Sequence, residues 1–186
     1  PVPLLIALHG AQGVETSMIA RWKALADAKT AVVLAVRGTV RVRDDSYRWD
    51  EHAEQTVMAI LNEVRAKVRV DPARIWLTGD GQGAYQAYRI AMHSPDLFHA
   101  VASFSGLYPP ELEYNFPEAK KHRLGVCLVH GEQDVEKLPA ARAAAQKMIE
   151  AGVACELVEH KGGADVPAED WTAISARVWE WLEKQR

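Results

Sequence analysis

The stretch I-W-L-T-G-D-G-Q-G at residues 75–83 passes from an apolar run into a turn that holds three glycines. The residues that follow, 83–93, have a helical pattern that stops before Ser94-Pro95. An apolar run that breaks through a glycine-rich turn into a helix is typical of a buried strand in an α/β protein. We therefore expect a strand over 74–78 that leads through this turn into a helix over 83–93.

Strand-like and helix-like segments alternate along the rest of the chain. Short apolar runs typical of buried strands occupy residues 4–8, 31–36, 100–104, 124–130 and 155–159, and apolar positions at helical spacing occupy 16–28, 51–68, 139–151 and 168–184. Residues 39–50 have no clean period and are expected to form a loop, Asp71-Pro72 a turn, and the residues from 105 through Pro117 a loop. The alternation predicts an α/β fold with a mainly parallel six-stranded sheet and helices on both faces.

Composition sets broader bounds on the class of protein. A chain of 186 residues with 48% hydrophobic and 25% charged residues is typical of one soluble globular domain, spanning residues 1–186. A net charge of −3 gives no electrostatic reason to expect nucleic acid or an anionic membrane as a partner. No apolar stretch reaches membrane-spanning length.

The ends and the cysteines add two expectations. The chain begins at Pro1 without methionine and enters a strand almost at once, so we expect a domain excised from a longer protein, whose other domains would be its partners. Cys127 and Cys155 lie inside separate strand-like runs and are expected to be two buried thiols rather than a disulfide.

The glycine-rich turn has the layout of a nucleophile elbow. In the G-x-S-x-G elbow, a serine occupies a strained corner between a strand and a helix. Here the pattern is Gly79-Asp80-Gly81-Gln82-Gly83, so the central position has no side chain. The layout that would carry a nucleophilic serine is therefore present without its reactive atom.

Five motifs together resemble one family. Residues 71–83 resemble the D-P-x-R-I-x-L-x-G-x-S-Q-G segment of the α/β-hydrolase superfamily, in the branch of phospholipase/carboxylesterases, dienelactone hydrolases and polyhydroxyalkanoate-depolymerase-like esterases. Four further segments resemble this branch in the expected order, and they are L-H-G-A at 8–11, P-D-L-F through S-G at 95–106, V-H-G-E-Q-D at 129–134 and K-G-G-A-D at 161–165. The resemblance covers nearly the whole chain and implies an α/β-hydrolase fold with the scaffold of a serine esterase.

The resemblance also implies which positions would carry the chemistry. Gly81 stands at the nucleophile position, Asp134 at the position of the triad acid, and Asp165 where the triad histidine would be. Acyl transfer needs a nucleophilic oxygen, a base that takes its proton and an acid that orients the base. Glycine cannot attack, and the carboxylate of Asp165 has too low a pKa and the wrong geometry to replace imidazole. Only the triad acid remains.

The oxyanion hole does not depend on these side chains. In this family its donors are the amide that follows the nucleophile, here Gln82, and one in the first strand-to-helix loop, here Ala11. These amides could still favour an anion or a carbonyl oxygen, or they could persist only because the fold requires the turn. Both interpretations stay open at this point.

Other residues could in principle replace the lost groups. Asp80 is a poor substitute nucleophile, because shifting the elbow by one residue would put Gln82 where a small residue must pack. Ser103 and Ser105 are expected to be ordinary strand-end residues, and His160 either approaches Asp134 or is a strand-end histidine. His9 and His130 each precede a glycine and are expected to brace loops through hydrogen bonds.

The family geometry would make Asp134 and Asp165 face one another. Two close carboxylates would raise the pKa of one of them or attract a bridging calcium or magnesium ion. No cluster of spaced ligands supports a metal, so the simpler expectation is that Asp165 turns toward solvent. We expect neither a metal nor a cofactor.

Three functional classes remain. The first is a catalytically degenerate α/β-hydrolase-like domain, which acts as a binding or scaffold module with a small-molecule ligand in the vestigial cleft. The second is a carboxylic-ester hydrolase with an altered site that uses water, the oxyanion amides and Asp134. The third is an inactivated mutant of an esterase, which Asp165 disfavours because a change of serine to glycine would leave the histidine in place. The sequence favours the first class.

Overall fold

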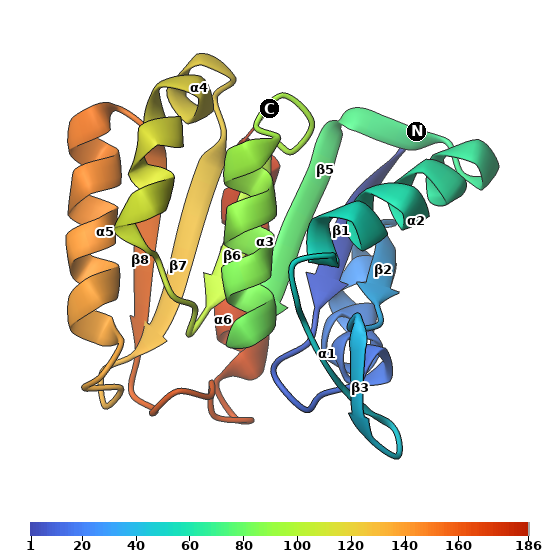
Figure 1. The fold of residues 1–186 in the computed structure, drawn as a ribbon, viewed down its shortest axis with the longest axis horizontal. Helices are drawn as coiled ribbons and strands as arrows, with labels where there is room; N and C mark the ends of the chain where they lie inside the picture. Colours follow the sequence, from blue (N-terminus) through green and yellow to red (C-terminus); the bar gives the residue numbers. More distant parts are fainter. Residues whose placement is uncertain (186) are drawn as a thin grey trace.

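The computed structural model describes residues 1–185, which form a six-stranded sheet in the order β2-β1-β5-β6-β7-β8 (Figure 1). All five strand pairs in this sheet are parallel. The strands are β1 (Val2–Leu8), β2 (Val32–Val36), β5 (Val70–Asp80), β6 (Ala100–Phe104), β7 (Gly125–Gly131) and β8 (Ala154–His160). The predicted α/β fold with a parallel six-stranded sheet is therefore confirmed.

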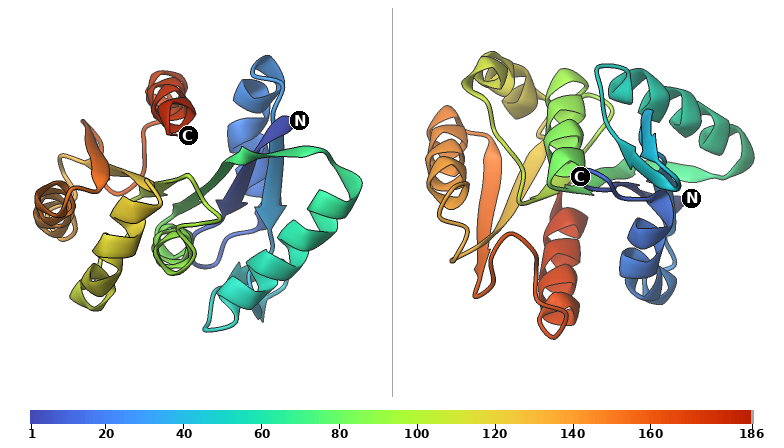
Figure 2. Two further views of the ribbon diagram at one scale, coloured as in Figure 1. Left: turned by 90° about the horizontal axis from the view of Figure 1, so that it is seen from above. Right: turned by 60° about the horizontal axis from the view of Figure 1, so that its bottom comes forward.

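Helices cover both faces of the sheet (Figures 1 and 2). One face is covered by α2 (Ala53–Lys67), α3 (Gln82–His93), α4 (Phe116–Lys121) and α5 (Leu138–Ala151), and the other by α1 (Glu15–Ala28) and α6 (Trp171–Lys184). The five helices that the sequence pattern predicts begin and end within three residues of their expected bounds. Apolar periodicity was sufficient to locate them, because each buries one face against the sheet.

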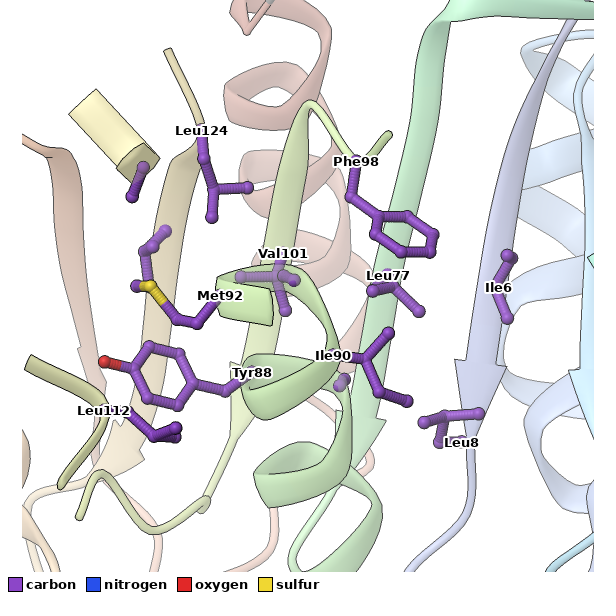
Figure 3. Packing of buried hydrophobic residues seen from close by; sticks show 14 of the residues in the cluster. Ile6, Leu8, Leu77, Tyr88, Ile90, Met92, Phe98, Val101, Leu112 and Leu124 are labelled. Carbon is purple, nitrogen blue, oxygen red and sulfur yellow. The ribbon is translucent and has the colours of Figure 1, made fainter. Parts of the chain in front are cut away.

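Alternate residues of the strands enter two separate cores. Ile6 and Leu8 of β1, with Leu77 of β5, point to the α3 side, where they pack with Tyr88 and Ile90 (Figure 3). The opposite side is rich in tryptophan: Trp76 of β5 meets Trp179 of α6 edge to face, with ring centroids 5.5 Å apart, and Trp22 of α1 meets Trp171 in the same manner at 5.2 Å. Such pairs add to the stabilisation that comes from burying the rings.

Three segments differ from the sequence-based expectation. Residues 39–50 are not wholly a loop, because β3 (Val40–Arg43) and β4 (Ser46–Arg48) form an antiparallel hairpin. The expected turn at Asp71-Pro72 lies inside β5, where the Asp71 carboxylate accepts hydrogen bonds from Ala73 N at 3.0 Å and Arg74 Nε at 2.6 Å. The expected loop through Pro117 contains a 3₁₀ helix (Pro110–Asn115) and the start of α4.

The elbow joins β5 to α3 through three glycines that have different reasons to be there. A Cβ at Gly79 would collide with the backbone of Gly83, and a Cβ at Gly83 would collide with the carbonyl oxygens of Leu8 and His9. Gly81 instead has φ 50° and ψ −110°, and a Cβ there would meet nothing within 4 Å. The outer glycines thus permit α3 to pack against β5 and β1, whereas Gly81 is favoured only by its positive φ.

We expect Gly83→Ala to lower the free energy of unfolding by about 2 kcal/mol or more, because the new methyl group must displace backbone atoms of β1. The matched control is Gly163→Ala, since a Cβ at that loop position meets nothing within 4 Å. Urea denaturation of both variants measures the difference. Equal stability of the two variants would contradict the close approach of α3 to β1.

Candidate functional site

The predicted site residues gather at the carboxyl end of the sheet, where open α/β sheets bind ligands. The register brings Leu8 beside Gly79 and Asp80 beside Phe104 across neighbouring strands. A cavity of about 190 Å³ opens at the elbow, and we call it the elbow cavity. Its wall includes Arg21, Asp80, Gly81, Ser105, Lys137 and Asp165.

The backbone of the elbow is held by hydrogen bonds on both sides of Gly81. Gly81 N donates to Phe104 O at 2.8 Å, and Tyr85 N donates to Gly81 O at 3.1 Å. The Gln82 side chain pairs with both backbone groups of Trp49, at 3.0 and 3.1 Å, and so ties the elbow to the loop that follows β4. Over residues 1–185, the backbone amide of Gln82 has no acceptor, as expected for the first residue of a helix.

The other expected oxyanion donor, Ala11, lies in a tight loop after β1. Gly13 N donates to Gly10 O at 3.0 Å, and Gln12 between them has φ 59°. His9 holds this loop in place, because its Nδ1 donates to Gly10 O at 2.7 Å while its Nε2 accepts from Gly38 N at 2.9 Å. Burial lowers the pKa of His9, which favours the neutral ring that this pattern requires. The expectation that His9 braces a loop is confirmed.

An ion pair that sequence reasoning missed occupies one wall of the elbow cavity. Asp80 pairs with Arg21 of α1, and the Arg21 guanidinium lies 4.2 Å from the centroid of a Trp171 ring. Burial raises the pKa of Asp80, the positive charge of Arg21 opposes this, and the negative charge of Asp165 adds to it. Because its carboxylate is bound to Arg21, Asp80 is not placed as a substitute nucleophile. No local sequence signal links these residues, which lie far apart in the chain.

Asp165 and Asp134 have different surroundings. Asp165 is exposed and lies on the wall of the elbow cavity with Asp80. Asp134 is buried with 9% of its surface exposed, its Oδ1 accepts a hydrogen bond from Lys137 N at 3.2 Å, and it is not among the residues that line the elbow cavity. No hydrogen bond joins the two carboxyl groups within the described part of the chain. The carboxylate that Asp165 influences is that of Asp80.

The buried histidines near Asp134 are part of the scaffold. His130 Nε2 is hydrogen-bonded to the Tyr108 hydroxyl at 2.8 Å, and that hydroxyl lies 3.1 Å from Ser103 Oγ. Burial lowers the pKa of His130 to about 4, although the charge of Asp134 opposes the shift. His160 Nδ1 accepts from Gly162 N at 3.1 Å, and burial lowers its pKa as well. His130 therefore braces a loop as predicted, and His160 is bonded to its own turn rather than to Asp134.

Ser105 is the only serine among the residues that line the elbow cavity. Its backbone has φ 50°, which is uncommon for a residue with a side chain. Its Oγ donates to Ala164 O, and its carbonyl oxygen accepts from Lys137 Nζ at 3.1 Å. The lysine thus contacts the backbone of Ser105 rather than its hydroxyl.

The described residues, 1–185, contain no group of three or more His, Cys, Asp and Glu side chains arranged to hold a metal ion. Cys127 and Cys155 are both free thiols, as the sequence suggested, with Cys127 buried and Cys155 partly buried. No helix in this part of the chain is long and apolar enough to cross a membrane.

The low pKa of His130 predicts a pH dependence of stability. The unfolded chain binds a proton at His130 near pH 6.5, whereas the folded protein does so only near pH 4, so stability is full above pH 6.5 and falls as the pH drops. We expect His130→Gln, whose amide can still bond Tyr108, to reduce this loss by roughly 1–3 kcal/mol between pH 6.5 and 4. His9, His99 and His160 have pKa shifts in the same direction, so some dependence should remain. Urea denaturation at pH 7 and 4.5 provides the test, and an unchanged difference in the variant would contradict it.

Comparison with known proteins agrees with this geometry. Residues 40–171 match the family model described as phospholipase/carboxylesterase. The NocK protein of Nocardia uniformis subsp. tsuyamanensis, an esterase by its name, is 30% identical over 115 residues, which cover 58% of this chain and 33% of NocK. Poly(3-hydroxyalkanoate) depolymerase C of Paucimonas lemoignei is 26% identical over 114 residues, which cover 56% of this chain and 28% of the depolymerase. The chain thus matches about a third of the length of these curated relatives.

The fold agrees as well. The crystal structure of the Bacillus cereus carboxylesterase superposes with a TM-score of 0.75 at 18% identity, covering 100% of this chain and 89% of that one. Likeness at this level of identity reports the α/β-hydrolase fold alone. The family model, which spans more than half of the residues, establishes the relationship. The chain belongs to the phospholipase/carboxylesterase family of α/β-hydrolases.

Proposed function

We propose that this esterase-like domain is catalytically degenerate and acts as a binding or scaffold module, with a small-molecule ligand in the elbow cavity. The observation that carries the proposal is the backbone conformation of Gly81 together with its lack of a side chain. Its backbone has the strained conformation of an elbow and its Cβ direction is open, yet it has no side chain with which to attack. The fold is thus built to present a nucleophile at a position that holds none.

The surrounding groups support this proposal because none completes a nucleophile–base pair. Ser105 Oγ donates to the carbonyl oxygen of Ala164, and the nearby Lys137 contacts the Ser105 carbonyl. Asp165, at the position of the base, is an exposed carboxylate. An activated hydroxyl needs a base within hydrogen-bond reach. Within residues 1–185, no hydroxyl group on the cavity wall is hydrogen-bonded to a side chain that could act as its base.

The alternative is a carboxylic-ester hydrolase that uses the oxyanion amides of Ala11 and Gln82 together with Asp134. The position of Asp134 gives it less support. Its Oδ1 is bound to the Lys137 amide, and it does not line the cavity into which a substrate carbonyl would enter. A carboxylate outside the cavity cannot activate a water molecule on the reacting carbon.

The elbow cavity offers groups that suit a neutral carbonyl compound. The ammonium group of Lys137 can donate hydrogen bonds, and Asp165 can accept one. Gln82, whose amide is free, lines an adjoining hollow of about 280 Å³ that shares Gly81, Ser105 and Lys137 with the elbow cavity. Arg21 and Asp80 neutralise each other, and Lys137 and Asp165 bring one charge of each sign. A cavity with this balance of charges favours neutral ligands over free carboxylates.

The names of the curated relatives denote ester chemistry, which makes an ester carbonyl the ligand group we propose. We further propose that the domain works beside other domains of a longer protein.

Restoring the missing groups tests the degeneracy. We expect the unmodified chain to hydrolyse p-nitrophenyl acetate no faster than the roughly 10³–10⁴-fold residual rate enhancement that an oxyanion hole and binding alone provide. Gly81→Ser alone should add little, because the hydroxyl has room but no imidazole. The double variant Gly81→Ser with Asp165→His should exceed the product of the single effects, since the groups act as a unit.

The matched control is Gly163→Ser with Asp165→His, which keeps the new histidine and places the new serine outside the elbow. Labelling by a serine-directed fluorophosphonate checks the nucleophile directly. Rapid turnover and labelling of the unmodified chain would overturn the proposal. If Ser105→Ala then removed both the turnover and the labelling, Ser105 would be the nucleophile.

A further inference from the structure

A second cavity, larger than the elbow cavity, lies away from the elbow. It is a hollow of about 660 Å³ between α1 and α6, on the face of the sheet opposite α3. We call it the α1–α6 groove. One wall consists of Ala20, Ala24 and Ala28, which are spaced four residues apart on α1 and therefore follow one side of the helix, and the facing wall includes Trp171, Thr172 and Ala176.

Two contacts hold the helices on either side of the groove. Near the start of α6, Trp171 Nε1 donates to Arg21 O at 3.0 Å. At the C-terminal ends of both helices, Lys29 Nζ lies 3.1 Å from Glu183 Oε2. The helices therefore run side by side in the same direction, and the two views of Figure 2 place both on the same face of the sheet. The groove lies between helices that are tied together, so it is a feature of the folded framework.

The groove meets the elbow cavity at shared residues. Arg21 and Val166 line both cavities. The Arg21 guanidinium is held between Asp80 and the Trp171 ring, so its charge is already neutralised. Among residues 1–185, Arg21 is also the only ionisable residue that lines the groove. The elbow cavity, which Gly81 also lines, therefore adjoins the groove.

We propose that the α1–α6 groove binds the alkyl chain of a neutral amphiphile whose polar end lies in the elbow cavity. This inference rests on the proposed function, in which the elbow cavity binds a carbonyl compound without hydrolysing it. The volume lies within the ~300–1,000 Å³ that is usual for small-molecule sites. The small alanine side chains make the α1 wall apolar and leave room for a flexible chain, and the paired Arg21 gives no attraction to a free anion.

The experiment uses N-phenyl-1-naphthylamine, a neutral apolar fluorophore, and 1-monodecanoylglycerol below its micelle-forming concentration. The unmodified chain should bind the fluorophore saturably, and monodecanoylglycerol should displace it. Ala24→Trp places a large ring in the groove from an exposed helical position and should weaken both ligands by at least about 10-fold. The control Ala173→Trp, exposed on α6 outside the groove, should leave both affinities unchanged. Thermal melts confirm that both variants are folded.

A second variant tests the polar end. Lys137→Met removes a donor from the elbow cavity and should weaken monodecanoylglycerol but not the fluorophore. Absence of saturable binding, equal effects of the two tryptophan variants, or an unchanged affinity of Lys137→Met for monodecanoylglycerol would each overturn the inference. Release of decanoate is measured separately. Turnover would contradict the proposed function. The binding data for the two tryptophan variants would then decide by themselves whether the alkyl chain lies in the groove.

Discussion

The close approach of α3 to the ends of β1 and β5 is the constraint on which the rest of this structure depends. It is possible only because Gly79 and Gly83 have no side chains, since a methyl group at either position would enter neighbouring backbone. The approach brings the first turn of α3 beside the loop after β1 and leaves the amide of Gln82 without an acceptor. The hydrogen-bond donor that remains at this helix N-terminus is therefore a product of packing.

This constraint separates two kinds of residue at the site. The two expected oxyanion donors, Ala11 and Gln82, would act through backbone amides, whose place depends on the packing of α3 and on the tight loop at Gly10 rather than on the reacting side chains. The triad positions are different. Gly81 faces open space, and Asp165 is exposed, so neither supports the core. Asp165 can therefore be exchanged at little cost in stability, whereas the positive φ of Gly81 favours glycine over a residue with a side chain. Asp134 is different, because it is buried and its Oδ1 accepts a hydrogen bond from the Lys137 amide.

Sequence reasoning located what is encoded locally. Apolar runs placed the six strands, and the motif around 79–83 placed the elbow. It failed where the signal was short or exposed. In V-R-V-R of β3 the period-two alternation is only four residues long and the hairpin is largely exposed, so no hydrophobic run marks it. Asp71-Pro72 has turn chemistry, but the carboxylate bonds within an irregular stretch of β5 where its register with β1 shifts.

The site shows the same division between local and long-range information. Gly81, Asp134 and Asp165 could be named from motifs, whereas the assembly of Asp80, Arg21 and Trp171 could not. Its contacts join residues 59 and 150 positions apart, and no spacing rule links them. A meeting of Asp134 and Asp165 would need the geometry of an intact triad, and the exposure of Asp165 agrees with the simpler expectation that it turns toward solvent. Without a histidine between them, nothing holds the carboxylates together, and each has the surroundings that its own loop provides.

Arg21 connects the two faces of the molecule that bear on function. Its guanidinium pairs with Asp80 on the wall of the elbow cavity and lies over a Trp171 ring. Its carbonyl oxygen accepts a hydrogen bond from Trp171 Nε1 at the end of the α1–α6 groove. None of these contacts involves a residue at a triad position. The groups that could bind a ligand are therefore backbone amides, an ion pair and helix walls, all of which are fixed by packing. The positions at which the family resemblance places the reacting side chains, Gly81 and Asp165, are open or exposed. Under the proposed function, ligand binding and catalysis would therefore depend on different parts of the fold.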